Sequence, residues 1–236
     1  MIAQLFNTLL YKPLFNILIA LYIFIPGGDF GIAIILLTVL IKLLLYPLNV
    51  KAIRSQKAFA ILQPQIKEIQ EKYKNEKEKQ ATEIMALYKR EKVNPFSGIA
   101  PLFIQLPVLI ALYWVFQKGI NMEHMSELYS FMPVPTQIKA SLLGIIDLTK
   151  PNIVLAVLSG ILQYWQAKMS LFQNKSANKE KKKQSDFSEI MGKQMLYFMP
   201  IFTVVILFSL PSAIGLYWSV STLFMIVQQY IINKKK

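Results

Sequence analysis

The sequence predicts an all-α polytopic membrane protein with five transmembrane helices, an N-terminal interfacial helix and a cytosolic helical hairpin. Three observations support this fold class. The 236 residues are 54% hydrophobic, with a mean hydropathy of +0.41. Residues 93–117 carry no charge over 25 positions and 194–233 carry none over 40, whereas about 20 apolar residues suffice to cross the hydrocarbon layer. The basic residues, finally, are concentrated in a few of the segments between the uncharged runs.

The N-terminal segment precedes the first predicted span. Its apolar stretch over 5–25 is interrupted by Lys12, Pro13 and Asn16, which leaves 17–25 as roughly half a crossing. We therefore predict an amphipathic helix that lies in the outer interface, with a sixth span as the alternative. The N-terminus has neither a basic region followed by a small-residue cleavage site nor the composition of a transit peptide, so we expect no removed signal peptide.

The long uncharged run near the C-terminus predicts two spans. As a helix, the 40 residues of 194–233 would be about 60 Å long, which is enough for two crossings. Pro211 lies near the middle, and PSAIG (211–215) supplies the turn. The preceding segment NKSANKEKKKQS (174–185) has no apolar periodicity and predicts a flexible loop.

Lys and Arg are distributed unevenly between the predicted spans. Residues 51–93 hold eleven, 173–193 hold six and the tail 234–236 holds three, whereas 1–30 hold one and 118–150 hold three. The positive-inside rule places the first group in the cytoplasm, so we expect the N-terminus outside and the C-terminus inside. The predicted segments are 1–30 (outer interfacial helix), 31–50 (first span), 51–93 (cytosolic hairpin), 94–117 (second span), 118–150 (outer loop), 151–169 (third span), 170–193 (basic cytosolic loop), 194–210 (fourth span), 211–232 (fifth span) and 233–236 (basic cytosolic tail).

Segment 51–93 contains two stretches with apolar residues at helical spacing, separated by KNEKEK (74–79) as a solvated turn. This pattern predicts a charged helical hairpin that projects into the cytosol, with a solvated extension without a partner as the alternative. The periodic residues are Ile66, Ile69 and Tyr73 in the first helix and Ile84, Leu87 and Tyr88 in the second.

Lys42 lies inside an otherwise apolar span, TVLIKLLLYPLNV (38–50). The cytosolic end of that span is about 12 Å away, roughly twice the reach of a lysine stem. An ionisable group at this depth costs about 3 kcal/mol or more and usually faces a water-filled cavity. No Asp or Glu occurs in any predicted span, so a buried carboxylate partner is excluded. We predict that Lys42 faces a hydrated cavity, with Thr38 and Asn49 on the same helix face.

Polar side chains also recur at helical spacing in the other spans. Each stripe alone is typical of hydrogen bonding between membrane helices. Together with an unpaired Lys42, the stripes predict a shared, positively charged groove suited to an acidic or polar guest. They comprise Gln105 between Pro101 and Pro107 in the second span; Ser159, Gln163 and Gln166 in the third; and Trp218, Ser221, Thr222 and Gln229, with Met225 between them, in the fifth.

The residues offer little for catalysis. The chain has no cysteine, no Gly-rich phosphate loop, no Ser–His–Asp set and no intramembrane carboxylate pair. The only histidine, His124, lies in the outer loop near Glu123 and Glu127 and is expected to be a surface residue rather than a metal ligand. We therefore expect neither an enzyme nor a bound cofactor or metal, and no nucleotide hydrolysis.

Several segments resemble the YidC-type membrane protein insertases, a family with mitochondrial and thylakoid members. The resemblance covers nearly the whole chain. It implies a five-span core, a cytosolic hairpin and a positively charged groove that is open to cytosol and lipid but closed outside. In that family, the groove receives hydrophilic parts of a nascent chain while the apolar segment slides into lipid. The similar segments are YKPLFN (11–16), FGIAIILLTVLIKLLLYPL (30–48), LQPQIKEIQEKY (62–73), MALYKREKVNPFSGIAPLFIQLPVLIALYWVF (85–116) and FMPIFTVVILFSLPSAIGLYWSVSTLFMIVQQYII (198–232).

The resemblance also assigns groove positions. By its spacing to YPL, Lys42 matches the positive residue of the family's groove, which is usually Arg. Lysine keeps the charge but lacks the planar five-donor group, and it requires a well-hydrated groove. The large extracytoplasmic domain of many relatives has no counterpart in this sequence. The expected groove residues are Lys42, Gln105, Gln163, Gln166, Trp218 and Ser221; Gln166 and Gln163 are alternative matches for one position in the third span.

The resemblance implies nascent membrane proteins and the bilayer of the bacterial plasma (inner) membrane as partners. The basic loop and tail favour the ribosome as a further partner, and the Sec translocon is another candidate. The alternative function is a small-solute transporter or channel built on the same polar stripes. Transporters often contain internal repeats, and we find none in this sequence.

Overall fold

The computed structural model describes residues 2–94, 100–119, 122–176 and 194–234, and this part of the chain is mainly helical. The helical content confirms the predicted all-α class. The elements are α1 (Ile2–Phe6), the π-helical turn η1 (Asn7–Tyr11), α2 (Lys12–Phe24), α3 (Phe30–Leu44), α4 (Tyr46–Lys72), α5 (Lys77–Arg90), α6 (Ala100–Gly119), the 3-10 helix η3 (Met122–Glu127), β1 (Ser141–Leu142), β2 (Ile146–Asp147), α7 (Ile153–Ser176), the π-helical turn η4 (Gln194–Phe198), α9 (Met199–Leu207) and α10 (Ser212–Lys234).

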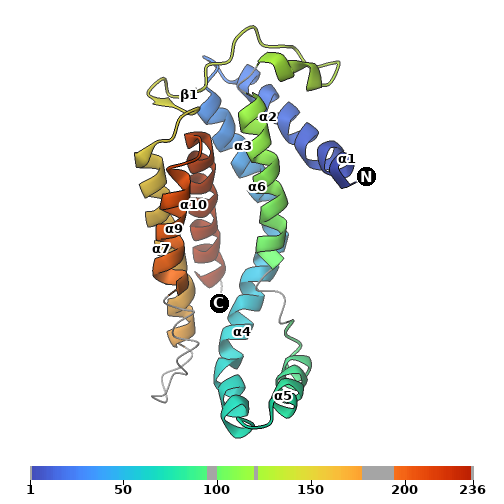
Figure 1. The fold of residues 1–236 in the computed structure, drawn as a ribbon, viewed down its shortest axis with the longest axis vertical. Helices are drawn as coiled ribbons and strands as arrows, with labels where there is room; N and C mark the ends of the chain where they lie inside the picture. The colour runs from blue at the N-terminus through green and yellow to red at the C-terminus, as the bar shows by residue number, and fades with distance from the viewer. Residues whose placement is uncertain (1, 95–99, 120–121, 177–193, 235–236) are drawn as a thin grey trace.

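Helices α3, α6, α7, α9 and α10 form an elongated bundle, with α2 packed against α3 and α6 (Figure 1). α10 contacts α3, α6, α7 and α9, so it links the two sides of the bundle. Large side chains such as Phe30, Phe116 and Tyr217 are fully buried between these helices. Apolar side chains also cover the outer surfaces, for example Ile110 and Val205. Such a continuous apolar exterior is typical of helices that face lipid.

The segment expected as one continuous span, 31–50, is broken in the structure. α3 ends at Leu44 and α4 begins at Tyr46, and the two helix axes are bent by 61°. Pro47 lies in the first turn of α4, where its missing N–H and fixed φ are tolerated. The prediction that Asn49 shares one helix face with Thr38 and Lys42 is therefore wrong, because Asn49 lies beyond the bend.

The N-terminal 24 residues are helical along most of their length and end in α2. Two side chains of α2 bind the outer loop. The Asn16 Oδ1 accepts from the Tyr129 amide at 2.7 Å, and the Tyr22 hydroxyl accepts from the Lys139 amide at 3.0 Å. These bonds hold the outer loop along α2, and the interfacial position of the N-terminal helix stays a prediction, with a sixth span as its alternative.

Length and composition alone do not identify five spans. Within the described residues, one helix, Ala3–Phe24, is long enough and apolar enough to cross a membrane. The bent pair Phe30–Leu44 and Tyr46–Ser55 also qualifies if the two helices are counted as one span. α7 and α10 are 24 and 23 residues long, but their Ser and Gln side chains lower the mean hydropathy. The five-span topology therefore stays a prediction.

The second half of α4 packs against α5 through its own small hydrophobic cluster. Leu62 and Ile66 of α4 meet Leu87 and Tyr88 of α5, apart from the main core. α5 begins at Lys77, inside the segment expected as a turn, so the connection is shorter than predicted. Figure 1 shows this pair extending beyond the bundle. Its position in the cytosol remains a prediction.

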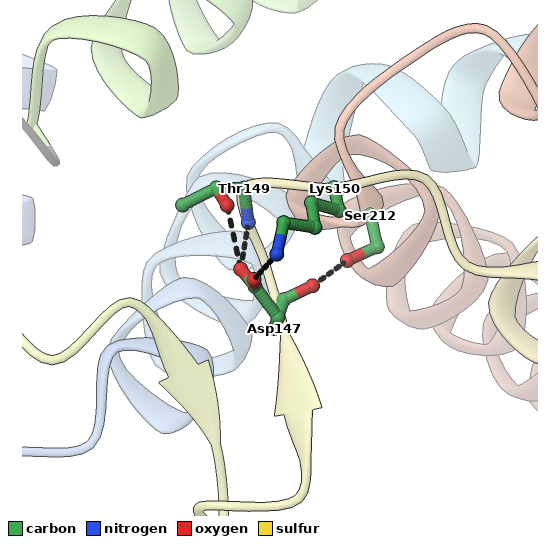
Figure 2. Close-up of polar contacts among 4 residues, drawn as sticks. All are labelled: Asp147, Thr149, Lys150 and Ser212. Carbon is green, nitrogen blue, oxygen red and sulfur yellow. Dashed lines mark hydrogen bonds and ion pairs between the residues drawn. The ribbon is translucent and has the colours of Figure 1, made fainter.

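The outer loop closes over one end of the bundle, where it caps α10. The Ser212 hydroxyl donates to the Asp147 carbonyl at 2.8 Å (Figure 2). The Ser212 amide donates to the Lys150 carbonyl at 2.9 Å. The Asp147 carboxylate accepts from both the amide and the hydroxyl of Thr149 and pairs with Lys150 at 3.3 Å. The Thr149 hydrogen bonds and then the Lys150 ammonium lower the pKa of Asp147. The loop is thus fixed to the start of α10.

Substitution by alanine should have opposite effects on stability at two helical glycines of the bundle. A Cβ on Gly160 of α7 would lie 2.4 Å from Val204 Cγ2 of α9, whereas a Cβ on Gly215 of α10 would meet Leu155 Cβ at an ordinary 3.4 Å. We expect Gly160→Ala to lower the free energy of unfolding by about 1–3 kcal/mol through overpacking. Gly215→Ala should be neutral or stabilising because alanine favours the helix. Thermal melts of both variants in detergent check this, and equal melting temperatures would contradict it.

Candidate functional site

Lys42 lies at the centre of a polar cluster that joins three helices. Its Nζ on α3 donates to the Gln105 Oε1 of α6 at 3.1 Å. The Gln105 Nε2 in turn donates to the Tyr217 hydroxyl of α10, and Ser221, one turn along α10, lies beside the same hydroxyl. The structure therefore brings together Lys42, Gln105 and Ser221, three of the residues expected to line a groove.

The Lys42 side chain is buried in this structure, and the hydration of its surroundings stays a prediction. Lys42 is only 4% exposed to solvent. Within the described part of the chain, its polar partner is the neutral Gln105, and no Asp or Glu forms an ion pair with it. A neutral amide can accept a hydrogen bond but cannot balance the charge of an ammonium group. The described residues thus leave the charge on Lys42 without an opposite charge.

Tyr217 is the member of this cluster that the sequence analysis missed. It is 1% exposed, and its hydroxyl connects Gln105 to Ser221. The sequence did contain a signal, because a tyrosine inside an apolar helix needs a hydrogen-bond partner for its hydroxyl. Tyr217 also stands four residues before Ser221, which places both on one helix face.

The polar stripe of α7 mainly binds α10. The Ser159 hydroxyl is fully buried, bonds its own helix at Leu155 and reaches across to the Gly215 carbonyl and the Ser219 hydroxyl at 3.1 and 2.9 Å. Lower down the same pair of helices, the Gln229 Nε2 donates to the Ser170 hydroxyl at 3.0 Å. These are the interhelical bonds that small polar residues make in membranes. Ser159 and Gln229 therefore hold α7 against α10.

Gln163 and Gln166 of α7 are half-buried and, in the described part of the chain, no hydrogen bond joins either to the Lys42 cluster. The Gln163 Oε1 is buried without a hydrogen-bond partner. Among the described residues, three further amides share this property: the Asn49 Nδ2 of α4 and, on α10, the Gln228 Oε1 and the Asn233 Oδ1. Gln228 donates with its nitrogen to the Tyr46 carbonyl at 3.2 Å. Buried amides without partners are costly to the fold.

Trp218 faces a different surface from its neighbour Tyr217. It lines an apolar cavity of about 330 Å³ between α6, α9 and α10. The cavity and the polar cluster thus involve consecutive residues of α10, Trp218 and Tyr217. Its other lining residues are Leu109, Ile110, Tyr113, Met199, Phe202, Thr203, Ile206, Leu207, Leu210 and Ile214.

His124 belongs to an ion-pair group in the segment 118–150 that we predict to be the outer loop. Its Nδ1 lies 3.4 Å from the Glu127 Oε1, which also binds the Lys118 ammonium at 3.2 Å. Burial raises the pKa of Glu127, but the nearby Tyr11 hydroxyl, the hydrogen bond from Lys118 and the nearby positive charges outweigh it, so the net shift is downward. The His124 side chain is 35% exposed, which agrees with its expected place at the surface. No group of three or more His, Cys, Asp and Glu that could hold a metal occurs among the described residues.

Two of the predicted features lie outside the described residues. The described residues do not include most of the basic segment 174–185. They also omit residues 95–98 of NPFSG (94–98), a part of the segment that resembles the insertase family. The expected flexible loop and ribosome contact therefore stay predictions.

A bundle of apolar-faced helices around a buried lysine defines a helical membrane protein with an internal polar cluster. The chain belongs to the YidC-type family: the family model described as 60Kd inner membrane protein matches residues 17–236. The chain is 36% identical over 208 residues to a protein of Fusobacterium nucleatum named membrane protein insertase YidC, covering 88% of each chain. It is 34% identical over 207 residues to a protein of the same name from Francisella tularensis subsp. novicida, covering 88% of this chain but only 33% of that protein's length. The resemblance seen in the sequence is thus confirmed.

Proposed function

We propose that this protein is a membrane protein insertase. It receives hydrophilic parts of nascent membrane proteins at the Lys42 cluster and releases their apolar segments into lipid without nucleotide hydrolysis. The names of its relatives support insertion of membrane proteins as the activity. The observation that carries the mechanism is the buried Lys42, which has a neutral partner and no opposing carboxylate among the described residues.

An acidic or polar client segment would supply what Lys42 lacks. Electrostatic attraction is weakly screened where water is excluded, so a single ammonium at this depth can bias which segment enters. The amides Gln105, Gln163 and Gln166 can bond peptide groups of any sequence, since they combine donors and acceptors. Such a site would favour polar chains without selecting one sequence. Entry would require the helices around Lys42 to separate, because the side chain is buried at rest.

The apolar part of a client needs a different surface. The cavity beside Trp218 lies between α6 and α9, and its lining is almost wholly apolar. Because Tyr217 and Trp218 are adjacent on α10, a client could place a polar segment at Lys42 and an apolar segment against α6 and α9 at once. This adjacency supports a transfer from polar cluster to lipid in one short movement.

We also propose the orientation that the charge distribution predicts. The N-terminus would lie outside, the hairpin 51–93 and the C-terminus in the cytoplasm, with five spans between them. The bilayer and nascent membrane proteins are the main partners. The ribosome would bind through the basic loop and tail, and a Sec translocon would act with the protein on some clients.

Reconstitution of the pure protein into liposomes tests the insertase against the alternative of a solute transporter or channel. We expect a short single-span substrate to insert without ATP, as measured by protection of its translocated tail from protease. Empty liposomes provide the baseline. Flux of small solutes with no gain in protected substrate would favour the transporter instead.

The orientation can be tested by labelling single cysteines, since the chain contains none of its own. Lys77→Cys in the hairpin should react with a membrane-impermeant maleimide only after the cells are opened, whereas His124→Cys should react in intact cells. Both variants should react fully in detergent, which controls for reactivity. Labelling at position 77 from outside would contradict the five-span topology.

A further inference from the structure

The tip of the outer β-hairpin has an unusual residue for its backbone conformation. Leu143 and Gly144 both have positive φ, +53° and +70°, and the Ile145 amide donates to the Leu142 carbonyl at 3.0 Å. This is the geometry of a type I′ turn, whose first central position normally holds Asn, Asp or Gly. A leucine in the left-handed region is uncommon. The turn therefore carries an apolar side chain at a position where water-facing hairpins have a polar one.

The tip presents its apolar side chains outward. Leu143 is 65% exposed and Ile145 is 83% exposed, whereas Leu142 and Ile146 on the strands pack against the main core. The hairpin thus buries one pair of aliphatic residues and exposes a second pair. Neither residue of the exposed pair belongs to the hydrophobic core of the described residues, so the pair is available for an apolar contact outside the chain.

The tip is held firmly in this position. The Asp29 Oδ2 accepts from the Leu143 amide at 2.5 Å, while its Oδ1 caps α3 by accepting from the Ile32 amide at 2.8 Å. A Cβ on Gly31 would come within 2.8 Å of the Leu142 Cα, so glycine permits this close approach of hairpin and helix. The exposed pair is therefore fixed to the outer end of α3.

The hairpin lies at the end of the bundle where α7 begins (Figure 1). Only five residues separate Asp147 of β2 from Ile153, the first residue of α7. Ile153 and Val154 are 63% and 64% exposed, so the outward apolar surface of α7 starts close to the hairpin. The exposed Lys150 lies between the hairpin and α7 in the sequence. Apolar side chains with an adjacent basic residue are typical of segments at the membrane interface.

We propose that the hairpin tip, Leu143 and Ile145, inserts into the outer leaflet of the bilayer at the boundary between headgroups and acyl chains, with Lys150 at the headgroups. The lipid surface is the occupant because the tip lies at the same end of the bundle as the exposed apolar start of α7, with the exposed Lys150 between them in the sequence. The insertion would anchor the outer ends of α3 and α10 at a fixed depth, because the same loop is hydrogen-bonded to Asp29 and to Ser212. The inference rests on the proposed outer position of the loop.

Spin labels on single cysteines test this proposal in the full-length protein. Ile145→Cys would carry the tip label, Lys150→Cys the matched loop control, and Val157→Cys on α7 the control within the bilayer. In liposomes of phosphatidylethanolamine and phosphatidylglycerol, collision with oxygen and with a water-soluble nickel chelate reports depth. We expect the tip label to favour oxygen over the chelate severalfold relative to position 150, although less than position 157.

Each other result has a distinct meaning. A tip label as accessible to the chelate as position 150, with position 157 still in lipid, would overturn the insertion but leave the spans intact. A tip label shielded from both reagents would show protein rather than lipid against the hairpin and would also overturn it. A label at position 157 that is fully accessible to the chelate would instead contradict the membrane topology on which the proposed function depends.

Discussion

Replacing Lys42 by alanine should lower the insertion of clients with acidic translocated tails about tenfold or more, while neutral-tailed clients are affected less. Two charges about 6 Å apart interact by about 3 kcal/mol at an effective dielectric of about 20, and a tenfold effect needs only about half of that. Lys42→Glu should be worse because repulsion replaces attraction. Lys42→Arg should retain activity, since its guanidinium stays charged and can still donate to the Gln105 Oε1.

Stability separates this charge effect from a folding defect. Removing an intramembrane charge that lacks a carboxylate partner relieves a cost of a few kcal/mol, so the melting temperature of Lys42→Ala should hardly fall and could rise. Lys168→Ala provides a matched control, because it removes a lysine of α7 that lies over the Tyr164 ring. Insertion yield and melting temperature are measured side by side in the liposome assay. Normal insertion of acidic-tailed clients by Lys42→Ala, or a defect that merely follows unfolding, would refute the charge mechanism.

Deleting residues 60–90 should abolish insertion yet leave a folded membrane core. The α4–α5 contact has its own hydrophobic cluster around Leu62 and Leu87, separate from the main core. Removing it therefore exposes no core side chain of the bundle. We propose that the helical hairpin 51–93 receives chains from the cytosol, so its loss should affect delivery to the Lys42 cluster rather than the cluster itself.

Circular dichroism and melting temperature would establish that the deleted protein is folded. Leu87→Asp offers a milder companion variant, since it breaks the α4–α5 contact while keeping the chain length. We expect it to reduce insertion partially, because the hairpin charges remain but their arrangement loosens. Full insertion by the deletion variant would show that the hairpin is dispensable, whatever its position relative to the membrane.

The main features of the protein class were predictable from the sequence. Uncharged runs, apolar composition and helical periodicity are local properties of the chain, and they correctly indicated an all-α fold. Lys42 could be singled out for the same reason, because an isolated charge in an apolar segment is visible without knowing what surrounds it. The family followed from similar segments distributed over most of the chain.

The roles of the other polar residues depended on tertiary structure. Ser159 and Gln105 look alike in the sequence, each a polar residue in a predicted span, yet one bonds α7 to α10 and the other bonds Lys42. Their difference arises from how far the helices are rotated and how closely they approach. The buried state of Lys42 has the same origin, since α6 and α10 enclose its side chain.

The sequence by itself determined the chemical types available: an apolar helical chain, a strong bias of basic residues and one lysine without a carboxylate in its span. Only the tertiary structure decided which groups meet. The bend after Leu44 separates Asn49 from Lys42, and the contact of α6 with α10 connects Gln105 to Tyr217. Composition and periodicity act within a segment, whereas a contact between helices depends on angles and separations set by the packing of the whole bundle.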